Sequence, residues 1–319
     1  MSCRTIGVDV SKDKLDVATW PQSQGSNTSC QFSNAPDGYE SLVEFAADVE
    51  AQLVVMEATG GLEKQCASHL RDAGVTVEVV NPRQARDFAS SLGYLEKNDT
   101  IDAVVLARFA GVIEPSEVYG DDELTEKLTQ LVRRREGLVK MRSKEQNRRK
   151  RQTDEDVIAS IDNIIRNFND EIESIEQQIE ALVSDSRLEH SVEILTSVPG
   201  VAETTATILL ANLPELGELN RKEIAKLGGL APLSNDSGES IGQRQCYGGR
   251  PRIRTAMRMG ALTATQYCEP IKQFYHRLLD RGKAKSLALI ASARKLLTIL
   301  NSMMRTKSEF QPEKAMPKL

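Results

Sequence analysis

The sequence predicts an α/β domain followed by two long charged helices and a mostly helical C-terminal domain. Three observations carry this prediction. Over residues 4–112, short runs rich in β-branched residues alternate with helical patterns. Residues 121–187 are highly charged and contain no proline and a single glycine, whereas residues 192–305 hold several helical runs of small apolar residues. We expect an α/β domain over residues 1–115 and a basic helix with a coiled coil over 120–190. A C-terminal domain over 191–306 and a tail over 307–319 follow.

Each N-terminal element has a local reason in the sequence. The runs RTIGVDV and KLDVATW, joined by the turn-prone SKD, predict an antiparallel β-hairpin, and CQFSN predicts a third strand. DGYESLVEFAADVEA has apolar residues at helical spacing after an aspartate that we expect to cap the helix. QLVVMEATG and VTVEVVNP predict two further strands, the second ending at Pro82, and residues 61–73 and 99–112 predict helices. This order indicates a mixed sheet flanked by helices.

A heptad-like apolar pattern follows in the charged segment. Eight large apolar residues alternate at spacings of three and four: Ile158, Ile161, Ile165, Phe168, Ile172, Ile175, Ile179 and Leu182. This is the seam of a coiled coil of about three and a half heptads. We expect the helix to join copies of the chain into a dimer or tetramer. The alternative is an antiparallel pair within one chain, with the basic helix at 124–151 as the partner.

The composition is that of a soluble globular protein. Hydrophobic residues make up 40% of the 319, and no apolar run approaches the 18 residues that cross a membrane. The five cysteines are scattered and form no CxxC or Cys/His cluster, so neither a zinc site nor a disulfide framework is indicated. We expect a cytoplasmic protein without membrane partners. Aromatic residues, at 4%, are too scarce for broad base-stacking platforms.

The charge is unevenly distributed. Residues 133–151 contain ten basic residues and two acids, although the whole chain has a net charge of −5. A second basic run, between Ile241 and Cys268, contains no acid. Both runs suit contacts with nucleic-acid phosphates, and solvated helix faces are the alternative. The candidate nucleic-acid contacts are Arg133, Arg134, Arg135, Arg148, Arg149, Lys150, Arg151, Arg244, Arg250, Arg252 and Arg254.

The C-terminal segment begins with a turn and an apolar helix, SVPGVAETTATILLANL, which is similar to a helix-hairpin-helix. Backbone N–H groups in such an element can hold a phosphate. A loop rich in glycine and arginine, GESIGQRQCYGGRPRIR, leads to two further helices, TAMRMGALTATQY and SLALIASARKLLTILNSMM. We expect the tail from Lys307 onward to be disordered.

Four acids stand out in the α/β domain. Asp9 and Glu57 end apolar strands, and Asp99 and Asp102 lie three residues apart at the start of a predicted helix. If the fold gathers them, their oxygens would select Mg²⁺ or Mn²⁺, and two such ions can clamp a phosphodiester displacement. Singly, Asp9 could be a turn residue and Asp99 a helix cap. An ionised Glu57 behind LVVM needs a partner of some kind.

A phosphate-loop interpretation competes with the metal site. GVDVSKDKLDVA also looks like the first phosphate loop of actin-like ATPases and sugar kinases. Those folds need a second glycine-rich phosphate loop, for which MEATGG is only a faint candidate. Strand transfer that proceeds without ATP would eliminate this interpretation.

The chain resembles the DEDD-type transposases of bacterial insertion sequences, which are related to the Piv invertase and known as bridge-RNA-guided recombinases. The resemblance covers nearly the whole chain and rests on five motifs in the family's order. They are IGVDVSKDKLDVA, MEATGG, KNDTIDAVVLARF, SVPGVAETTATILLANLPELG and GGLAPLSNDSGESIGQRQCYGGRPRIRTAMRMGAL. One departure is Asn98, where the usual motif reads Lys-Thr-Asp.

The resemblance implies a fold and a set of roles. The N-terminal domain would be RuvC-like, with an RNase H fold, and Asp9, Glu57, Asp99 and Asp102 would be its catalytic metal ligands. The catalytic serine would be Ser237, in NDSG, although a turn serine is the plain alternative and none of the three histidines lies beside it. Ser234 and Ser240 are nearby decoys.

The function implied is an ATP-independent DNA transposase or recombinase. It would use Mg²⁺ or Mn²⁺, join double-stranded donor and target DNA through a covalent phosphoserine intermediate, and be guided by a structured noncoding RNA. It would act in the cytoplasm, associated with the nucleoid. Alternatives are a site-specific invertase, a junction-resolving nuclease of the same fold, and a non-catalytic nucleic-acid-binding coiled-coil protein.

Overall fold

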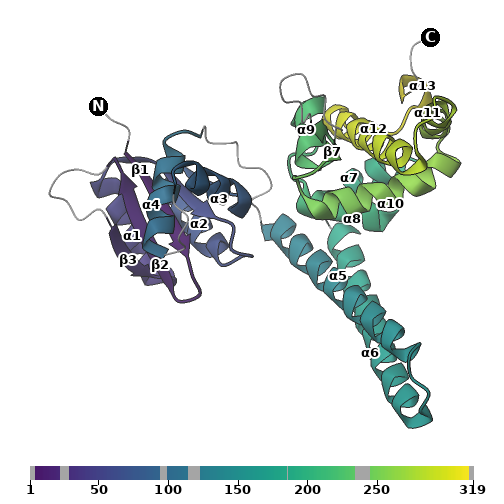
Figure 1. Cartoon of the computed structure of the whole chain (residues 1–319), viewed down its shortest axis with the longest axis horizontal. Coiled ribbons are helices and arrows are strands. Elements are labelled where there is room, and N and C mark those ends of the chain that lie inside the picture. The colour runs from purple at the N-terminus through teal and green to yellow at the C-terminus, as the bar shows by residue number, and fades with distance from the viewer. Residues whose placement is uncertain are drawn as a thin grey trace. The chain divides into compact units, whose positions relative to one another are not determined.

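The computed structural model describes residues 4–21, 29–93, 99–113, 123–184, 186–233 and 245–315 (Figure 1). The chain divides into two compact units, Met1–Val118 and Tyr119–Leu319. The helical hairpin and the C-terminal helices therefore belong to one unit. We refer to the two as unit 1 and unit 2.

Unit 1 is built on a mixed five-stranded sheet. Its strands are β1 (Arg4–Val10), β2 (Lys14–Trp20), β3 (Ser29–Ser33), β4 (Ala51–Glu57) and β5 (Val77–Val80). Their order is β3-β2-β1-β4-β5. The predicted hairpin is confirmed, since β1 pairs antiparallel with β2, and β3 continues the antiparallel part. On the other side, β4 runs parallel to β1 and β5 runs parallel to β4.

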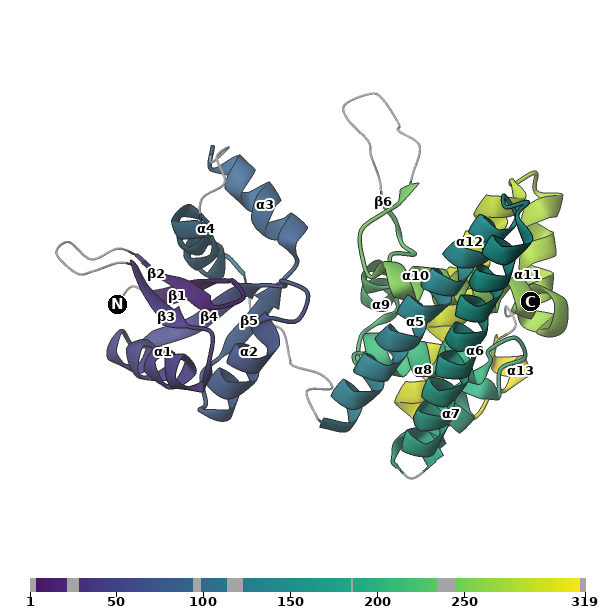
Figure 2. The same ribbon diagram turned by 90° about the horizontal axis from the view of Figure 1, so that it is seen from below.

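Four helices cover the two faces of this sheet. They are α1 (Pro36–Asp48), α2 (Glu63–Asp72), α3 (Pro82–Ser91) and α4 (Asp99–Ala110). Figure 2 shows α1 and α2 on one face and α3 and α4 on the other. Strand residues alternate between the two sides accordingly. Ile6 and Val8 pack toward α1 and α2, whereas Leu53 and Val55 pack toward α4.

Two expectations about helix starts in unit 1 are wrong. Asp37 does not cap α1: Ala35 occupies the N-cap without a side-chain bond, and Asp37 lies in the first turn. Helix α3 is absent from the sequence prediction, which treated Pro82 only as the end of a strand. Pro82 is instead the first residue of α3, and the Asn81 side chain accepts a hydrogen bond from the Arg83 N–H. Proline suits this position because its missing N–H has no helical partner there.

Unit 2 begins with an antiparallel helical hairpin, α5 (Glu123–Arg149) and α6 (Glu155–Ser184), seen at the lower right of Figure 1. The apolar seam of α6 packs on α5 of the same chain, which is the alternative that the sequence left open. Ile172, Ile175 and Ile179 are buried in the core that Leu128, Val132 and Leu138 of α5 share. A coiled coil between copies remains a prediction.

The remaining elements of unit 2 are mostly helices. They are α7 (Leu188–Thr196), α8 (Glu203–Asn212), α9 (Arg221–Leu227), β6 (Pro232–Leu233), β7 (Gln245–Cys246), α10 (Pro251–Tyr267), α11 (Glu269–Asp280), α12 (Lys285–Thr306) and α13 (Pro312–Ala315). By length and composition, α12 could cross a membrane. It is instead a core helix here, since Leu296, Leu297 and Leu300 are completely buried.

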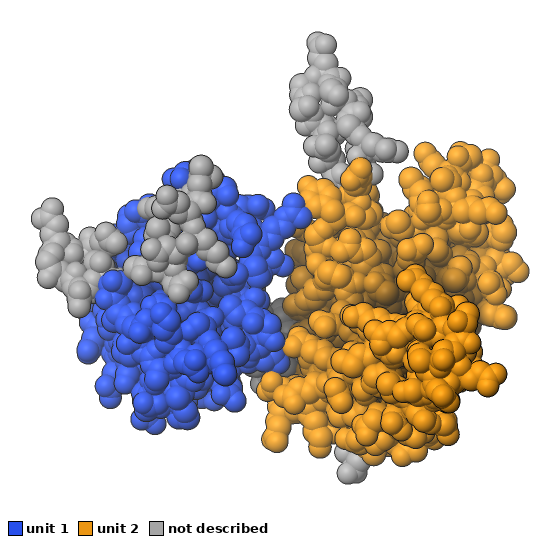
Figure 3. All heavy atoms as spheres, turned by 60° about the horizontal axis from the view of Figure 1, so that its bottom comes forward, with its two compact units in different colours: residues 1–118 blue, residues 119–319 orange. Residues whose placement is uncertain are grey.

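The described part of the tail, Lys307–Ala315, is ordered, contrary to the expected disorder from Lys307. The Phe310 N–H donates to Ser197 Oγ at 2.9 Å, and the Phe310 side chain packs against the core. This core runs from α5 to α12, whereas unit 1 has its own apolar layers on the two faces of its sheet. Figure 3 colours the two units separately.

Candidate functional site

Helix α4 lies directly against β1, and Gly7 makes this approach possible. A Cβ atom on Gly7 would collide with the backbone of Ala103 and Ala107. Beside it, Thr5 Oγ1 donates a hydrogen bond of 2.7 Å to the Ala107 carbonyl. Helix residue 107 thus lies over strand residue 5, and residue 103 over residue 7. The helix therefore runs antiparallel to β1, and its first turn points toward the Asp9 end of the strand.

The strand geometry puts Asp9 and Glu57 on the same side of the sheet. Asp9 shares a face of β1 with Thr5 and Gly7, because side chains alternate along a strand. On β4, Glu57 shares a face with Val55, which packs toward α4. The register pairs Gly7 with Val55, and Asp9 and Glu57 each follow two residues later. Both acids therefore lie at the same end of neighbouring strands, on the α4 side.

The other two acids belong to the first turn of α4. Asp99 is its first residue, and Asp102 directly precedes Ala103. The fold therefore brings Asp9, Glu57 and the start of α4 to one edge of the sheet. The Asp99 side chain lies outside the described residues. Among the side chains described, no three His, Cys, Asp or Glu residues are close enough to hold a metal ion.

A fifth acid, Asp16, was missed by the sequence reasoning. The β-hairpin register places it directly opposite Asp9 on the same face of the sheet. Gln31 donates to Asp16 Oδ1 at 2.7 Å, and the Lys14 ammonium lies 3.4 Å from Oδ2. The Asp16 side chain is only 15% exposed, and Oδ2 is buried without a hydrogen bond. The signal was present in VDVSKDKLDV, because a hairpin centred on SKDK pairs the two aspartates.

Ser237 and Arg244 lie outside the described residues, but the ends of their segment are defined. Leu233 pairs with Gln245 in the two-stranded ladder of β6 and β7, so residues 234–244 leave and return at one place. Two glycines, Gly229 and Gly249, pack against each other next to this ladder. A Cβ on Gly249 would overlap the backbone of Gly229, and both residues have positive φ angles, of 61° and 66°.

The arginines after this ladder are bonded within the chain. Arg250 makes a bidentate ion pair with Glu215, with N–O distances of 2.5 and 2.6 Å, and also donates to the Asn212 carbonyl. Arg252 pairs with Glu136 at 2.7 Å, and Arg254 donates to the Gly248 carbonyl at 3.0 Å. These contacts fasten α10 to its neighbours. We therefore do not carry these three arginines into the proposed nucleic-acid surface.

The basic residues of α5 divide into two groups. Those that face α6 are bonded to it: Arg135 to Glu176, Arg142 to Asn169 and Arg149 to Asp162. The hydrogen bond between Arg149 and Asp162 lowers the pKa of this aspartate and raises that of the arginine. Arg133, Arg134, Lys150 and Arg151 are exposed and have no side-chain partner among the described residues.

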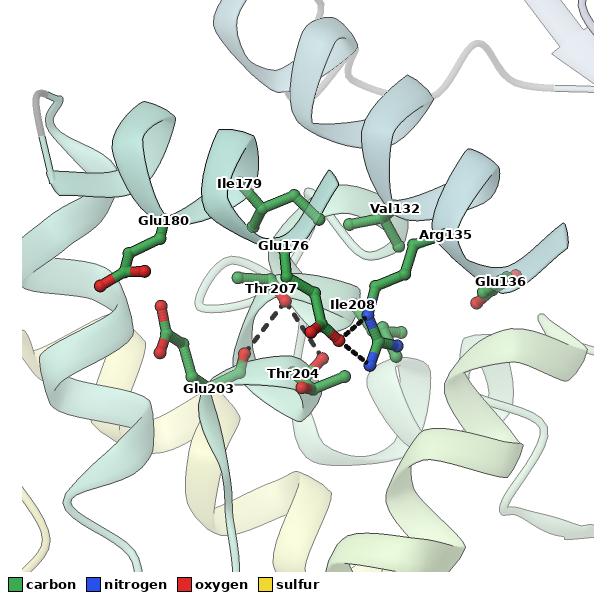
Figure 4. A pocket seen from close by; sticks show the side chains of 10 residues that line it. All are labelled: Val132, Arg135, Glu136, Glu176, Ile179, Glu180, Glu203, Thr204, Thr207 and Ile208. Carbon is green, nitrogen blue, oxygen red and sulfur yellow. Dashed lines mark hydrogen bonds and ion pairs between the residues drawn. The ribbon is translucent and has the colours of Figure 1, made fainter. Parts of the chain in front are cut away.

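A pocket of about 250 Å³ lies between α5, α6 and α8, beside the predicted helix-hairpin-helix (Figure 4). The first turn of α8 contributes Glu203 and Thr204 to it, and α6 contributes Glu176 and Glu180. In Figure 4 the carboxylates of Glu180 and Glu203 point toward each other. Such acids disfavour a phosphate in this pocket, and phosphate binding by the backbone of the helix-hairpin-helix element stays a prediction.

Two family models match this chain. One, described as a transposase and of the DEDD type of IS110, matches residues 6–155, and one described as "Transposase IS116/IS110/IS902 family" matches residues 192–276. Pilin gene-inverting proteins of Moraxella bovis and Moraxella lacunata are each 29% identical, over 97% of this chain and 98% of their own length. An IS110 insertion-element protein of Streptomyces coelicolor is 30% identical over 47% of this chain and 36% of its own length.

The two models cover both the edge of the sheet that carries the acids and the segment that contains Ser237. They fall in the same order and on the same motifs as the resemblance noted in the sequence. The chain belongs to the IS110 family of transposases.

Proposed function

We propose that this protein is an RNA-guided DNA recombinase that joins donor and target DNA through a covalent phosphoserine intermediate. The observation that carries the proposal is the edge of the unit 1 sheet, where the ends of β1 and β4 meet the first turn of α4. Strand register and the Gly7 contact put Asp9, Glu57 and Asp102 at this edge, together with the backbone of Asp99. The strand order and the helices on both faces support a RuvC-like fold for this unit.

The donors at this edge fit a hard divalent cation. All four acids supply carboxylate oxygens, and Mg²⁺ and Mn²⁺ prefer such ligands. We propose Asp9, Glu57, Asp99 and Asp102 as the residues that hold the ion. When bound, Mg²⁺ would stabilise the negative charge that develops on the reacting phosphate.

Ser237 is the proposed nucleophile. Its Oγ forms a bond to phosphorus while the bond from phosphorus to one DNA oxygen breaks. The hydroxyl proton passes through solvent to the leaving oxygen, which becomes a free DNA hydroxyl. The phosphoserine ester conserves the bond for rejoining to another strand, so no ATP is needed. The β6–β7 ladder supports this role by returning residues 234–244 to a fixed base.

Guide RNA, oligomerisation and location complete the proposal. The family resemblance supports the RNA, and recombination between two DNA partners requires more than one active site. Val157 and Ile164, which are seven residues apart on α6, are 42% and 40% exposed and offer apolar contacts to another copy. Light scattering of the full chain measures this assembly. We place the protein in the cytoplasm, on the nucleoid when it acts.

An adduct assay tests the catalytic proposal. The full-length protein is incubated with labelled duplex DNA from the flanks of its gene and with RNA transcribed from those flanks, with and without Mg²⁺. Denaturing gels then report DNA covalently attached to protein. We expect adducts that require Mg²⁺, no adduct with Ser237→Ala, and at least about a 100-fold loss with Asp9→Asn.

Matched controls lie close to both residues. Ser234→Ala removes a neighbouring hydroxyl, and Asp13→Asn removes an exposed carboxylate of the same hairpin, so both variants should retain the adduct. Adducts that persist in Ser237→Ala would place the nucleophile elsewhere. Adducts that form equally well in EDTA would remove the metal from the mechanism.

A second candidate is site-specific DNA inversion. It is favoured by the alignment with the two Moraxella pilin gene-inverting proteins, which spans nearly the whole of both chains, whereas the IS110 protein aligns over only part of its length. A plasmid with two inverted copies of the recombination site distinguishes the two reactions. Inversion reverses the orientation of the intervening segment in place, whereas transposition moves it to a new site.

A further inference from the structure

The outer face of α5 carries a basic stripe. Arg133, Gly137, Lys140, Lys144 and Arg148 recur every three or four residues, so they lie on one face of the helix, and Arg151 follows in the turn just after α5. This face points away from α6, which contacts α5 through the bonds of Arg135, Arg142 and Arg149. The five cationic side chains of the stripe are all exposed. At a rise of about 1.5 Å per residue, the helical part of the stripe, from Arg133 to Arg148, is about 22 Å long.

Four of the five stripe cations keep their charge without an acidic partner among the described residues. Of the two acids in this region, Glu136 pairs with Arg252 of α10 at 2.7 Å, and Glu145 lies 3.0 Å from Arg148, the one stripe cation with an acidic partner. Arg133, Lys140, Lys144 and Arg151 have no side-chain bond among the described residues. Near its end, Lys144, Asn147, Arg148, Arg151 and Gln152 line an open hollow of about 410 Å³. The cations that face α6 stabilise the hairpin through their bonds to α6, whereas those on the outer face make no such bond among the described residues.

Gly137 interrupts the stripe without a structural reason inside the chain. It lies in the middle of a 27-residue helix, where glycine costs about 1 kcal/mol relative to alanine. A Cβ built on Gly137 meets no atom within 4 Å, so no neighbour in the chain requires glycine. Its absent side chain leaves the helix backbone open to close approach between Arg133 and Lys140. Close approach by another backbone is a recurring use of glycine.

We propose that this stripe binds the sugar–phosphate backbone of double-stranded DNA, with Gly137 as the point of closest contact. The row of cations complements a duplex, which carries one negative charge per about 1.7 Å of its axis. No aromatic residue lies on the stripe, so it lacks the stacking contacts of a single-strand site. DNA is the chosen duplex because the family acts on DNA; in this respect the inference rests on the proposed function.

Charge and bulk can be tested separately in the full-length protein. Fluorescence anisotropy with a labelled duplex of about 30 base pairs gives the affinity over a range of salt concentrations. We expect Lys140→Gln/Lys144→Gln to weaken binding about tenfold or more and to lower the salt slope by about two. The control Lys127→Gln/Lys272→Gln removes the same charge from exposed positions off the stripe and should change binding less than about twofold.

Gly137→Leu tests the close approach. Leucine favours the helix, so thermal melting should show a fold at least as stable as the wild type, while DNA affinity falls about fivefold or more. Ser143→Leu adds bulk at another exposed position of α5, off the stripe, and should leave affinity unchanged. Equal DNA binding by the stripe variants and their controls overturns the proposal, and so does a loss confined to duplex RNA.

The outcome is separable from the recombinase chemistry. If wild-type protein forms the serine adduct but the stripe variants bind DNA normally, the proposed function stands and the stripe is refuted. If stripe variants lose DNA binding while wild type forms no adduct, the stripe stands and the chemistry is refuted.

Discussion

The two units use the charged residues of their motifs in opposite ways. In unit 1, strand register and helix docking bring carboxylates of like charge to one edge of the sheet. In unit 2, Arg250 and Arg252 are each paired with a glutamate from another part of the unit. Gathering like charges costs free energy unless a counter-ion offsets it, whereas an internal ion pair stabilises local structure. The same kind of sequence signal therefore corresponds to the proposed ligand site in unit 1 and to internal ion pairs in unit 2.

The largest expected effect tests how unit 1 gathers its acids. Gly7→Val puts a branched side chain into the backbone of α4, so the helix must move away from β1. We expect a loss of about 2–4 kcal/mol in the free energy of unfolding of unit 1, measured by denaturant titration. In the protein that remains folded, Mn²⁺ should no longer raise the melting temperature. Gly111→Ala, at the end of α4, is the matched control. An unchanged response to Mn²⁺ would contradict the docking argument.

A smaller effect tests the ion pair between Arg250 and Glu215 in unit 2. Arg250→Ala leaves Glu215, whose side chain is 15% exposed, without its bidentate partner. We expect the protein to lose about 1–2 kcal/mol in stability, and Arg250→Lys to restore only part of it, because an ammonium cannot make the paired bonds. DNA affinity of the folded variant should change less than about twofold. A large loss of DNA affinity at unchanged stability would show that Arg250 contacts nucleic acid. The contrast drawn between the two units would then not hold for this residue.

The smallest effect sharpens the description of unit 1. Asp16→Asn removes a charge directly opposite Asp9 but keeps the shape of the side chain. We expect Mn²⁺ to bind about two- to fivefold more weakly, measured by isothermal titration, since a nearby carboxylate adds electrostatic attraction without being a ligand. The variant Asp13→Asn, on the exposed turn, should bind as the wild type does. Tighter binding by Asp16→Asn would show that the acid competes for the ion.

Sequence periodicity was enough to predict most elements but not their starts. The hairpin, the parallel strands and helices α4, α8, α10 and α12 follow from apolar spacing and turn residues. Helix α3 was missed because proline ends a strand and begins a helix equally well, and only the Asn81 cap distinguishes the two. The expected cap at Asp37 failed because Pro36 already begins the helix one residue earlier.

The candidate site divides in the same way. Residue types and their local order are enough to point to the four acids, the serine and the basic helix, because they specify chemistry. The crossing of α4 over β1 at Gly7, the position of Asp16 opposite Asp9 and the packing of α6 on one face of α5 come from the folded structure. An apolar seam indicates that the surface needs an apolar partner, and a run of arginines indicates that it needs an opposite charge. Which partner meets that requirement depends on contacts between residues far apart in the chain, and those are set by packing.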